Sequence, residues 1–178
     1  MLTLAGLDEV WLMVSPQNPL KQGRSDLLND RLRYSIASIA LHGENHLHAS
    51  DYELALPRPS YTWNTLEHLK ADFPGFIFDL IIGGDNWEIF PRWFRSQDII
   101  REHRILVYPR AAVSSKTSVS DTYAALSAQP TSSGTPLFVS AALLPVSSTE
   151  VRRRVQCGES IDGLVPKTIA PLLQRCYS

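Results

Sequence analysis

The segment that most constrains the fold is an apolar run from Phe76 to Ile82, interrupted only by Asp79 and ended by two glycines. Continuous hydrophobicity that stops at a turn predicts a strand buried on both faces, the kind found in parallel sheets. Residues 10–14 have the same character and end in a segment rich in Pro and Asn. A sheet made of such strands needs helices on both of its faces.

Helical patterns alternate with these strands along the chain. Apolar spacing and capping residues predict helices near 26–41, 62–72, 86–90, 96–102, 148–157 and 167–175. Further strands are predicted at 47–54, 104–108 and 138–144, and residues 111–136, rich in Ser and Thr, predict a surface excursion. The alternation predicts an α/β fold with a mostly parallel sheet flanked by helices, and the length of 178 residues predicts a single domain, 1–178.

Composition narrows the class of protein. Seventeen basic and eighteen acidic residues argue against a broad basic surface for nucleic acid, so a phosphate would meet a local site. No apolar run approaches the roughly 18 residues of a membrane span, and no signal peptide opens the chain. Two cysteines, Cys157 and Cys176, favour reduced thiols. We therefore expect a soluble, cytoplasmic protein.

One candidate phosphate site lies near the carboxyl end of the chain. Ser147, Ser148 and Thr149 place three hydroxyls at the start of a predicted helix, and Arg152 follows within its first turns. Helix N-termini bind phosphate through unpaired N–H groups, and an Arg adds a charge-assisted contact. The plainer alternative is a capped helix with an exposed Arg.

Three other segments could line a ligand site. Asp85 follows the strongest strand, where open α/β sheets bind ligands, although a turn explains the glycines equally well. Trp93 and Phe94 could form a platform for a flat heterocycle or belong to a small core cluster. Thr62 stands at a helix start, and Lys21 follows the first strand.

Taken in order, these segments resemble bacterial nicotinate-nucleotide adenylyltransferases of the nucleotidylyltransferase superfamily. The resemblance rests on Ser15-Pro-Gln-Asn-Pro-Leu-Lys21, Ser60-Tyr-Thr-x-x-Thr-Leu66, Ile82-Gly-Gly-Asp85, Arg92-Trp-Phe94, Val146-Ser-Ser-Thr-Glu-Val-Arg152 and Leu164-Val-Pro166, and extends from Gly6 to Tyr177 apart from the excursion. It implies a Rossmann-like fold and transfer of AMP from ATP to nicotinate mononucleotide, giving deamido-NAD and pyrophosphate in NAD biosynthesis. The family needs no covalent intermediate and usually acts with Mg²⁺.

The resemblance also implies roles for individual residues. Those matching the mononucleotide segments are Thr62, Asp85, Trp93 and Phe94, with Trp93 stacked on the pyridine ring. Those matching the ATP phosphate segments are Lys21, Ser147, Ser148, Thr149 and Arg152. The implied partners are ATP and nicotinate mononucleotide, with neither nucleic acid nor membrane, and a homo-oligomer stays open.

One departure from the family concerns its first segment, a strand and Gly-rich loop carrying a His-x-Gly-His motif. None of the five histidines of this sequence stands in that pattern. We therefore expect an N-terminal truncation of roughly 25 residues, including the first, central strand, and we assign no catalytic residues. On that expectation adenylyl transfer by the chain as given is in doubt. The alternatives are a sister adenylyltransferase for nicotinamide mononucleotide or phosphopantetheine, and a non-catalytic remnant that binds a mononucleotide.

Overall fold

A computed structural model describes residues 5–16, 28–108, 135–139 and 146–177. The chain divides into two compact units. The first unit comprises Met1–Leu7 and Tyr61–Leu143, and the second comprises Asp8–Ser60 and Leu144–Ser178. Each unit contains a parallel sheet and helices. The predicted α/β class with parallel strands flanked by helices is thereby confirmed.

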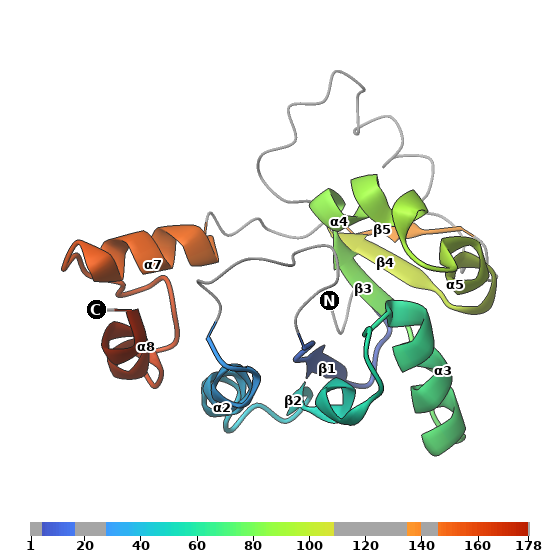
Figure 1. The fold of residues 1–178 in the computed structure, drawn as a ribbon, viewed down its shortest axis with the longest axis horizontal. Coiled ribbons are helices and arrows are strands. Elements are labelled where there is room, and N and C mark those ends of the chain that lie inside the picture. The colour runs from blue at the N-terminus through green and yellow to red at the C-terminus, as the bar shows by residue number, and fades with distance from the viewer. Residues whose placement is uncertain (1–4, 17–27, 109–134, 140–145, 178) are drawn as a thin grey trace. The chain divides into compact units, whose positions relative to one another are not determined.

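The first unit is built on a three-stranded sheet in the order β3-β4-β5 (Figure 1). The strands are β3 (Leu80–Gly83), β4 (Ile105–Tyr108) and β5 (Leu137–Phe138). Leu80 lies opposite Ile105 in the β3–β4 pair, and Leu106 lies opposite Leu137 in the β4–β5 pair. The helices of this unit are α3 (Thr62–Asp72), α4 (Gly84–Ile89), the 3-10 helix η3 (Phe90–Arg92) and α5 (Ser96–Glu102).

The core of the first unit lies between this sheet and its helices. Its fully or nearly buried members are Trp63, Leu66, Ile82, Phe90, Ile99, Ile105 and Val107. Trp63 and Leu66 are three residues apart on α3, so both project from one face of the helix. Helix α4 contacts β3, β4 and η3, which fixes the chain that leaves the carboxyl end of β3.

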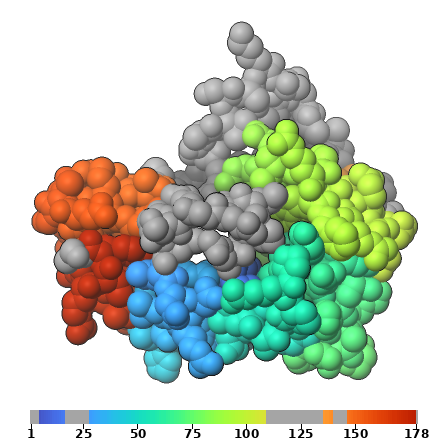
Figure 2. Space-filling view, in the orientation of Figure 1, coloured from blue at the N-terminus to red at the C-terminus, as the bar shows by residue number. Residues whose placement is uncertain are grey.

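The second unit has a two-stranded parallel sheet, in which β1 (Val10–Met13) pairs with β2 (Leu47–Ser50). Its helices are α2 (Asp30–Ala40), the 3-10 helix η2 (Tyr52–Ala55), α7 (Ser148–Gln156) and α8 (Ala170–Tyr177). Its core cluster consists of Val151, Val155, Ile161, Ile169 and Leu173, against which Ile36 and Ala40 of α2 pack. Helices α7 and α8, orange and red in Figure 2, lie in contact.

Several predicted elements have the predicted bounds. Helices α3 and α5 begin and end as expected, and α7 ends one residue earlier than expected. Gly158, which is predicted to end α7, has φ +68, and its N–H donates to the Val155 carbonyl at 3.0 Å. A left-handed glycine just beyond a helix is the usual C-terminal signal.

Other bounds were wrong. The predicted strand 76–82 begins only at Leu80, because its parallel partner β4 begins at Ile105, and residues 76–79 have no ladder to join. Ile77 is 95% exposed, and Phe76 instead stacks on Phe78 with ring centroids 6.0 Å apart. Strand β2 ends at Ser50 and gives way to η2, and the last helix begins at Ala170. Residues 109–134 and 140–145 lie outside the described residues, with most of the excursion and the end of the predicted strand 138–144.

Among the described residues, no helix combines the length and the apolar character that crossing a membrane requires.

Candidate functional site

All four residues matched to mononucleotide segments fall in the first unit. Thr62 is the first residue of α3, and Asp85 is in the first turn of α4, directly after β3. Trp93 follows η3, and Phe94 comes next. The segment order in the sequence therefore leads to one compact unit rather than to separate parts of the chain.

Two ring contacts join the start of α3 to the segment that follows η3. The rings of Tyr61 and Phe94 have centroids 4.7 Å apart at an interplanar angle of 30°. The guanidinium carbon of Arg95 lies 4.3 Å from the centroid of the Trp63 ring. These contacts bring the neighbourhood of Thr62 to the Trp93–Phe94 pair, as a shared ligand site requires.

The two neighbouring aromatic residues differ in environment. Trp93 is half-buried, packs against the core of the unit and lies 5.3 Å from Phe90 between ring centroids. Its indole Nε1 is buried and has no hydrogen-bond partner among the described residues. Phe94 is 47% exposed and rests on Tyr61. The pair thus combines a ring anchored in the core with a ring open to solvent.

Arg95, which no sequence pattern indicates, is the one non-glycine residue at positive φ in the described part of the chain, with φ 55. A left-handed backbone costs an L residue roughly 1–2 kcal/mol. The Arg95 Nε donates to Asp98 Oδ2 at 2.6 Å, and the ring contact with Trp63 holds the other side of the guanidinium. Hydrogen bonds from Arg95 and then Arg101 lower the pKa of the Asp98 carboxyl.

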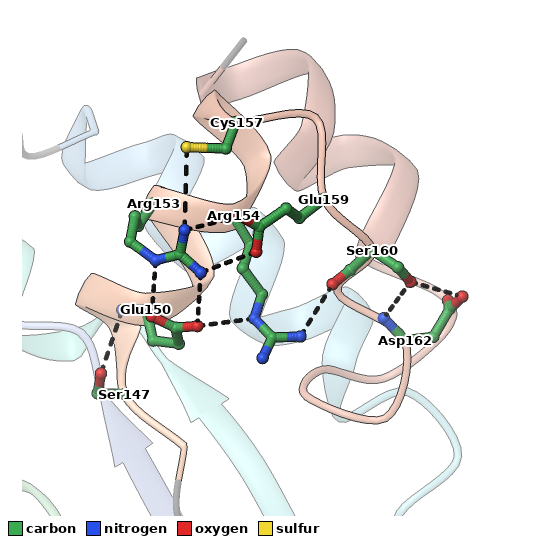
Figure 3. Close-up of polar contacts among 8 residues, drawn as sticks. All are labelled: Ser147, Glu150, Arg153, Arg154, Cys157, Glu159, Ser160 and Asp162. Carbon is green, nitrogen blue, oxygen red and sulfur yellow. Dashed lines mark hydrogen bonds and ion pairs between the residues drawn. The ribbon is translucent and has the colours of Figure 1, made fainter.

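The predicted phosphate segment forms the start of α7 in the second unit. The Ser147 Oγ accepts a hydrogen bond from the Glu150 backbone N–H at 3.1 Å, an N-cap contact shown in Figure 3. Ser148 and Thr149 are exposed in the first turn. The Glu150 side chain turns toward Arg153 and Arg154, and these hydrogen bonds lower its pKa to about 2.

The arginines of α7 differ in what occupies them. Arg153 pairs with Glu150 and also with Glu159 at 2.8 Å, while Arg154 donates to Glu150 and to the Ser160 carbonyl (Figure 3). Arg152, half-buried, lies one position earlier and therefore about 100° round the helix from Arg153. The carboxylate contacts thus explain the positions of Arg153 and Arg154.

A buried carboxylate that no sequence pattern indicates lies in the same unit. Glu53, on η2, is 5% exposed. Its Oε2 accepts from the Ser15 hydroxyl at 2.6 Å, and its Oε1 accepts from the Ser60 hydroxyl. Ser15 lies two residues after β1, in the segment that leads to Lys21, but Lys21 itself lies outside the described residues.

Within the described part of the chain, no three His, Cys, Asp or Glu side chains gather as a metal site. Mg²⁺ in nucleotide enzymes usually keeps several waters and binds substrate phosphates with only one or two carboxylates. Mg²⁺ that is bound to the phosphates of ATP therefore requires no cluster of three protein ligands.

Comparison with known proteins gives consistent names. A probable nicotinate-nucleotide adenylyltransferase of Flavobacterium johnsoniae is 33% identical over 169 residues, covering 95% of this chain and 82% of that protein. The protein of the same name from Bacteroides fragilis is 51% identical over 109 residues, covering 61% of this chain and 54% of the relative. The match to a Bacteroides thetaiotaomicron relative covers 51% of its length, so this chain matches about half of each Bacteroides protein. No family model matches the chain.

A solved structure shares the fold. Plasmodium falciparum nicotinic acid mononucleotide adenylyltransferase complexed with NaAD has a TM-score of 0.64 at 15% identity. The similarity covers 98% of this chain and 85% of that one. At this identity the comparison concerns the fold, which is the Rossmann-like arrangement expected from the sequence.

Proposed function

The chain belongs to the nicotinate-nucleotide adenylyltransferase family, and we propose that it takes part in transferring AMP from ATP to nicotinate mononucleotide, giving deamido-NAD and pyrophosphate. The observation that carries this proposal is the pairing of Tyr61 with Phe94, which joins two segments matched to mononucleotide binding within one unit. Family membership supports the reaction, and the ring contacts support the proposal of a site for a flat heterocycle in this unit.

In this proposal the acceptor occupies the first unit. The pyridine ring stacks on Trp93, whose core packing against Phe90 holds the indole at a fixed angle and so lowers the cost of ordering it on binding. Phe94 borders the ring, while the Thr62 hydroxyl and the Asp85 carboxylate are hydrogen-bonding groups for the ribose and nicotinate. Stacking and a few polar contacts are the usual composition of such sites.

The ATP phosphates are met by the start of α7. Ser147, Ser148, Thr149 and the first backbone N–H groups of this nine-residue helix offer donors, and Arg152 offers a positive charge. Lys21 completes the proposed set of phosphate ligands. Glu150 lies in the same turn, but its charge is compensated by Arg153 and Arg154, which keeps repulsion of a phosphate low.

The transfer itself forms a bond from a phosphate oxygen of the mononucleotide to the α-phosphorus of ATP, and the bond from that phosphorus to the leaving pyrophosphate breaks. The residues named above position the two substrates and offset the charge that develops, which is how such transfers are accelerated. Mg²⁺, when bound with ATP, supplies further charge neutralisation on the phosphates.

The test is an assay of pyrophosphate release with ATP, Mg²⁺ and one of three acceptors: nicotinate mononucleotide, its amide, or phosphopantetheine. We expect turnover with the acid form above all. Faster turnover with another acceptor identifies a sister adenylyltransferase instead. Binding of nicotinate mononucleotide without any turnover identifies a non-catalytic mononucleotide-binding chain.

The protein is further proposed to act in the cytoplasm, where free thiols such as Cys157 and Cys176 stay reduced. Light scattering coupled to gel filtration would measure whether the protein forms a homo-oligomer.

A further inference from the structure

Arg95 presents a guanidinium that is held on two sides and open on the third. One face of the group lies over the Trp63 ring at 4.3 Å, and Nε donates to Asp98. The Nη1 and Nη2 groups have no hydrogen-bond partner among the described residues, and the side chain is 46% exposed. Stacking occupies the face of a guanidinium and leaves its in-plane N–H groups available to an oxyanion.

The backbone at Arg95 favours a purpose beyond helix capping. Arg95 takes the N-cap position of α5, but its side chain makes no cap hydrogen bond. Asn, Asp or Gly would take this left-handed conformation at less cost. An arginine there is strained in backbone terms, and strained residues gather at functional sites.

The charges around Arg95 leave a positive surplus. Asp98 is shared between Arg95 and Arg101, while Glu102 is shared between Arg101 and Lys70. Three cations therefore face two carboxylates in this network. Solvent screens these exposed side chains, so an anion gains from direct contact with the open edge of Arg95 rather than from the surplus itself.

We propose that Arg95 determines specificity for the acid form of the mononucleotide, by donating from its open edge to the pyridine carboxylate. This inference rests on the proposed function. Arg95 follows Trp93 and Phe94, the rings proposed for the pyridine, and its stacking partner Trp63 follows Thr62. A guanidinium binds a carboxylate through two parallel hydrogen bonds, whereas a neutral amide accepts through one oxygen only.

The test measures dissociation constants of nicotinate mononucleotide and nicotinamide mononucleotide by isothermal titration calorimetry on the full chain. Wild type is expected to bind the acid more tightly. Arg95→Gln removes the charge. Arg95→Gly removes the charge and also relieves the strain of the positive φ, so it provides a second variant should Arg95→Gln fail to fold. Both should weaken binding of the acid about 10- to 100-fold and change binding of the amide less than about twofold. Arg95→Lys should restore only part of the loss.

The matched control is Arg101→Gln. It removes an equal positive charge from a side chain that pairs with the same carboxylate, Asp98. It should leave both dissociation constants within about twofold of wild type. Equal weakening of acid and amide by the Arg95 variants overturns the inference, because it indicates a structural role or a contact with the phosphate common to both ligands. An unchanged preference for the acid overturns it as well. A wild-type chain that binds neither mononucleotide overturns the proposed function, and the inference with it.

Discussion

Glu53 offers a prediction of stability that follows directly from its contacts. The carboxylate is buried and accepts hydrogen bonds from the hydroxyls of Ser15 and Ser60. A hydrogen bond to a charged group contributes about 1.5–3 kcal/mol, so the two bonds together are worth about 3–6 kcal/mol. Both serines are only partly buried, so after truncation their hydroxyls regain some hydrogen bonds with water. We therefore expect Glu53→Ala to lower the free energy of unfolding by about 3 kcal/mol.

Glu53→Gln tests whether the charge matters beyond shape. The amide keeps one acceptor oxygen but replaces the other with an NH₂ group, so one serine must accept instead of donate. The expected loss is about 1–2 kcal/mol, since both bonds become neutral. Urea unfolding at pH 7 followed by circular dichroism gives these values, with Glu44→Gln on the exposed turn after α2 as the control.

A double-mutant cycle makes the reasoning refutable. Glu53→Gln and Ser60→Ala should together cost less than the sum of the single losses, by about 0.5–2 kcal/mol, because Glu53→Gln already weakens the bond that Ser60→Ala removes. Additive losses would show that the two side chains are not coupled. A Glu53→Ala variant within about 0.5 kcal/mol of wild type would refute the energetic argument altogether.

Three further predictions concern the two ligand segments. Trp93→Ala should raise the KM for the mononucleotide about 5- to 150-fold and leave the KM for ATP unchanged, since stacking contributes about 1–3 kcal/mol; an unchanged mononucleotide KM contradicts this. Arg152→Ala should raise the KM for ATP about 10-fold or more, whereas Arg153→Ala, whose guanidinium is held by carboxylates, should not; the reverse order of sensitivity means that the helix face was wrongly assigned. The pKa of Glu150, lowered to about 2 in the fold from 4.5, implies stabilisation that is complete above pH 4.5 and lost as the pH falls toward 2. The difference in Tm between wild type and Glu150→Gln should therefore be largest near pH 7 and shrink below pH 4, and a difference independent of pH contradicts the ion-pair explanation.

The sequence predicted element type well where the signal was local. Helix α3 begins at Thr62 and α7 at Ser148, as capping residues and apolar spacing indicated. Gly158 ends α7 for a reason that belongs to its own backbone, a positive φ. Such features depend on a few neighbouring residues, and for that reason a sequence pattern contains them.

Strand limits depended on partners that a local pattern does not contain. The apolar run begins at Phe76, four residues before the paired part of the strand starts at Leu80. A parallel strand extends only as far as its neighbour pairs with it. The same limit applies to Glu53. A glutamate between Tyr52 and Leu54 gives no local sign of burial, and its two hydroxyl partners come from positions 38 and 7 residues away.

The segment 93–95 shows how a motif and its support differ. Trp93 packs into the core, Phe94 rests on Tyr61, and Arg95 lies over Trp63, so three consecutive residues have three different partners. Two of these partners, Tyr61 and Trp63, belong to the start of α3, so each of the two segments supplies a surface that orients the other. Changes at Tyr61 and Phe94 should therefore be strongly coupled, because either truncation removes the same ring contact. The spacing of the motifs along the chain could not reveal this pairing, since the rings meet only after α3, β3 and α4 have packed around the common core.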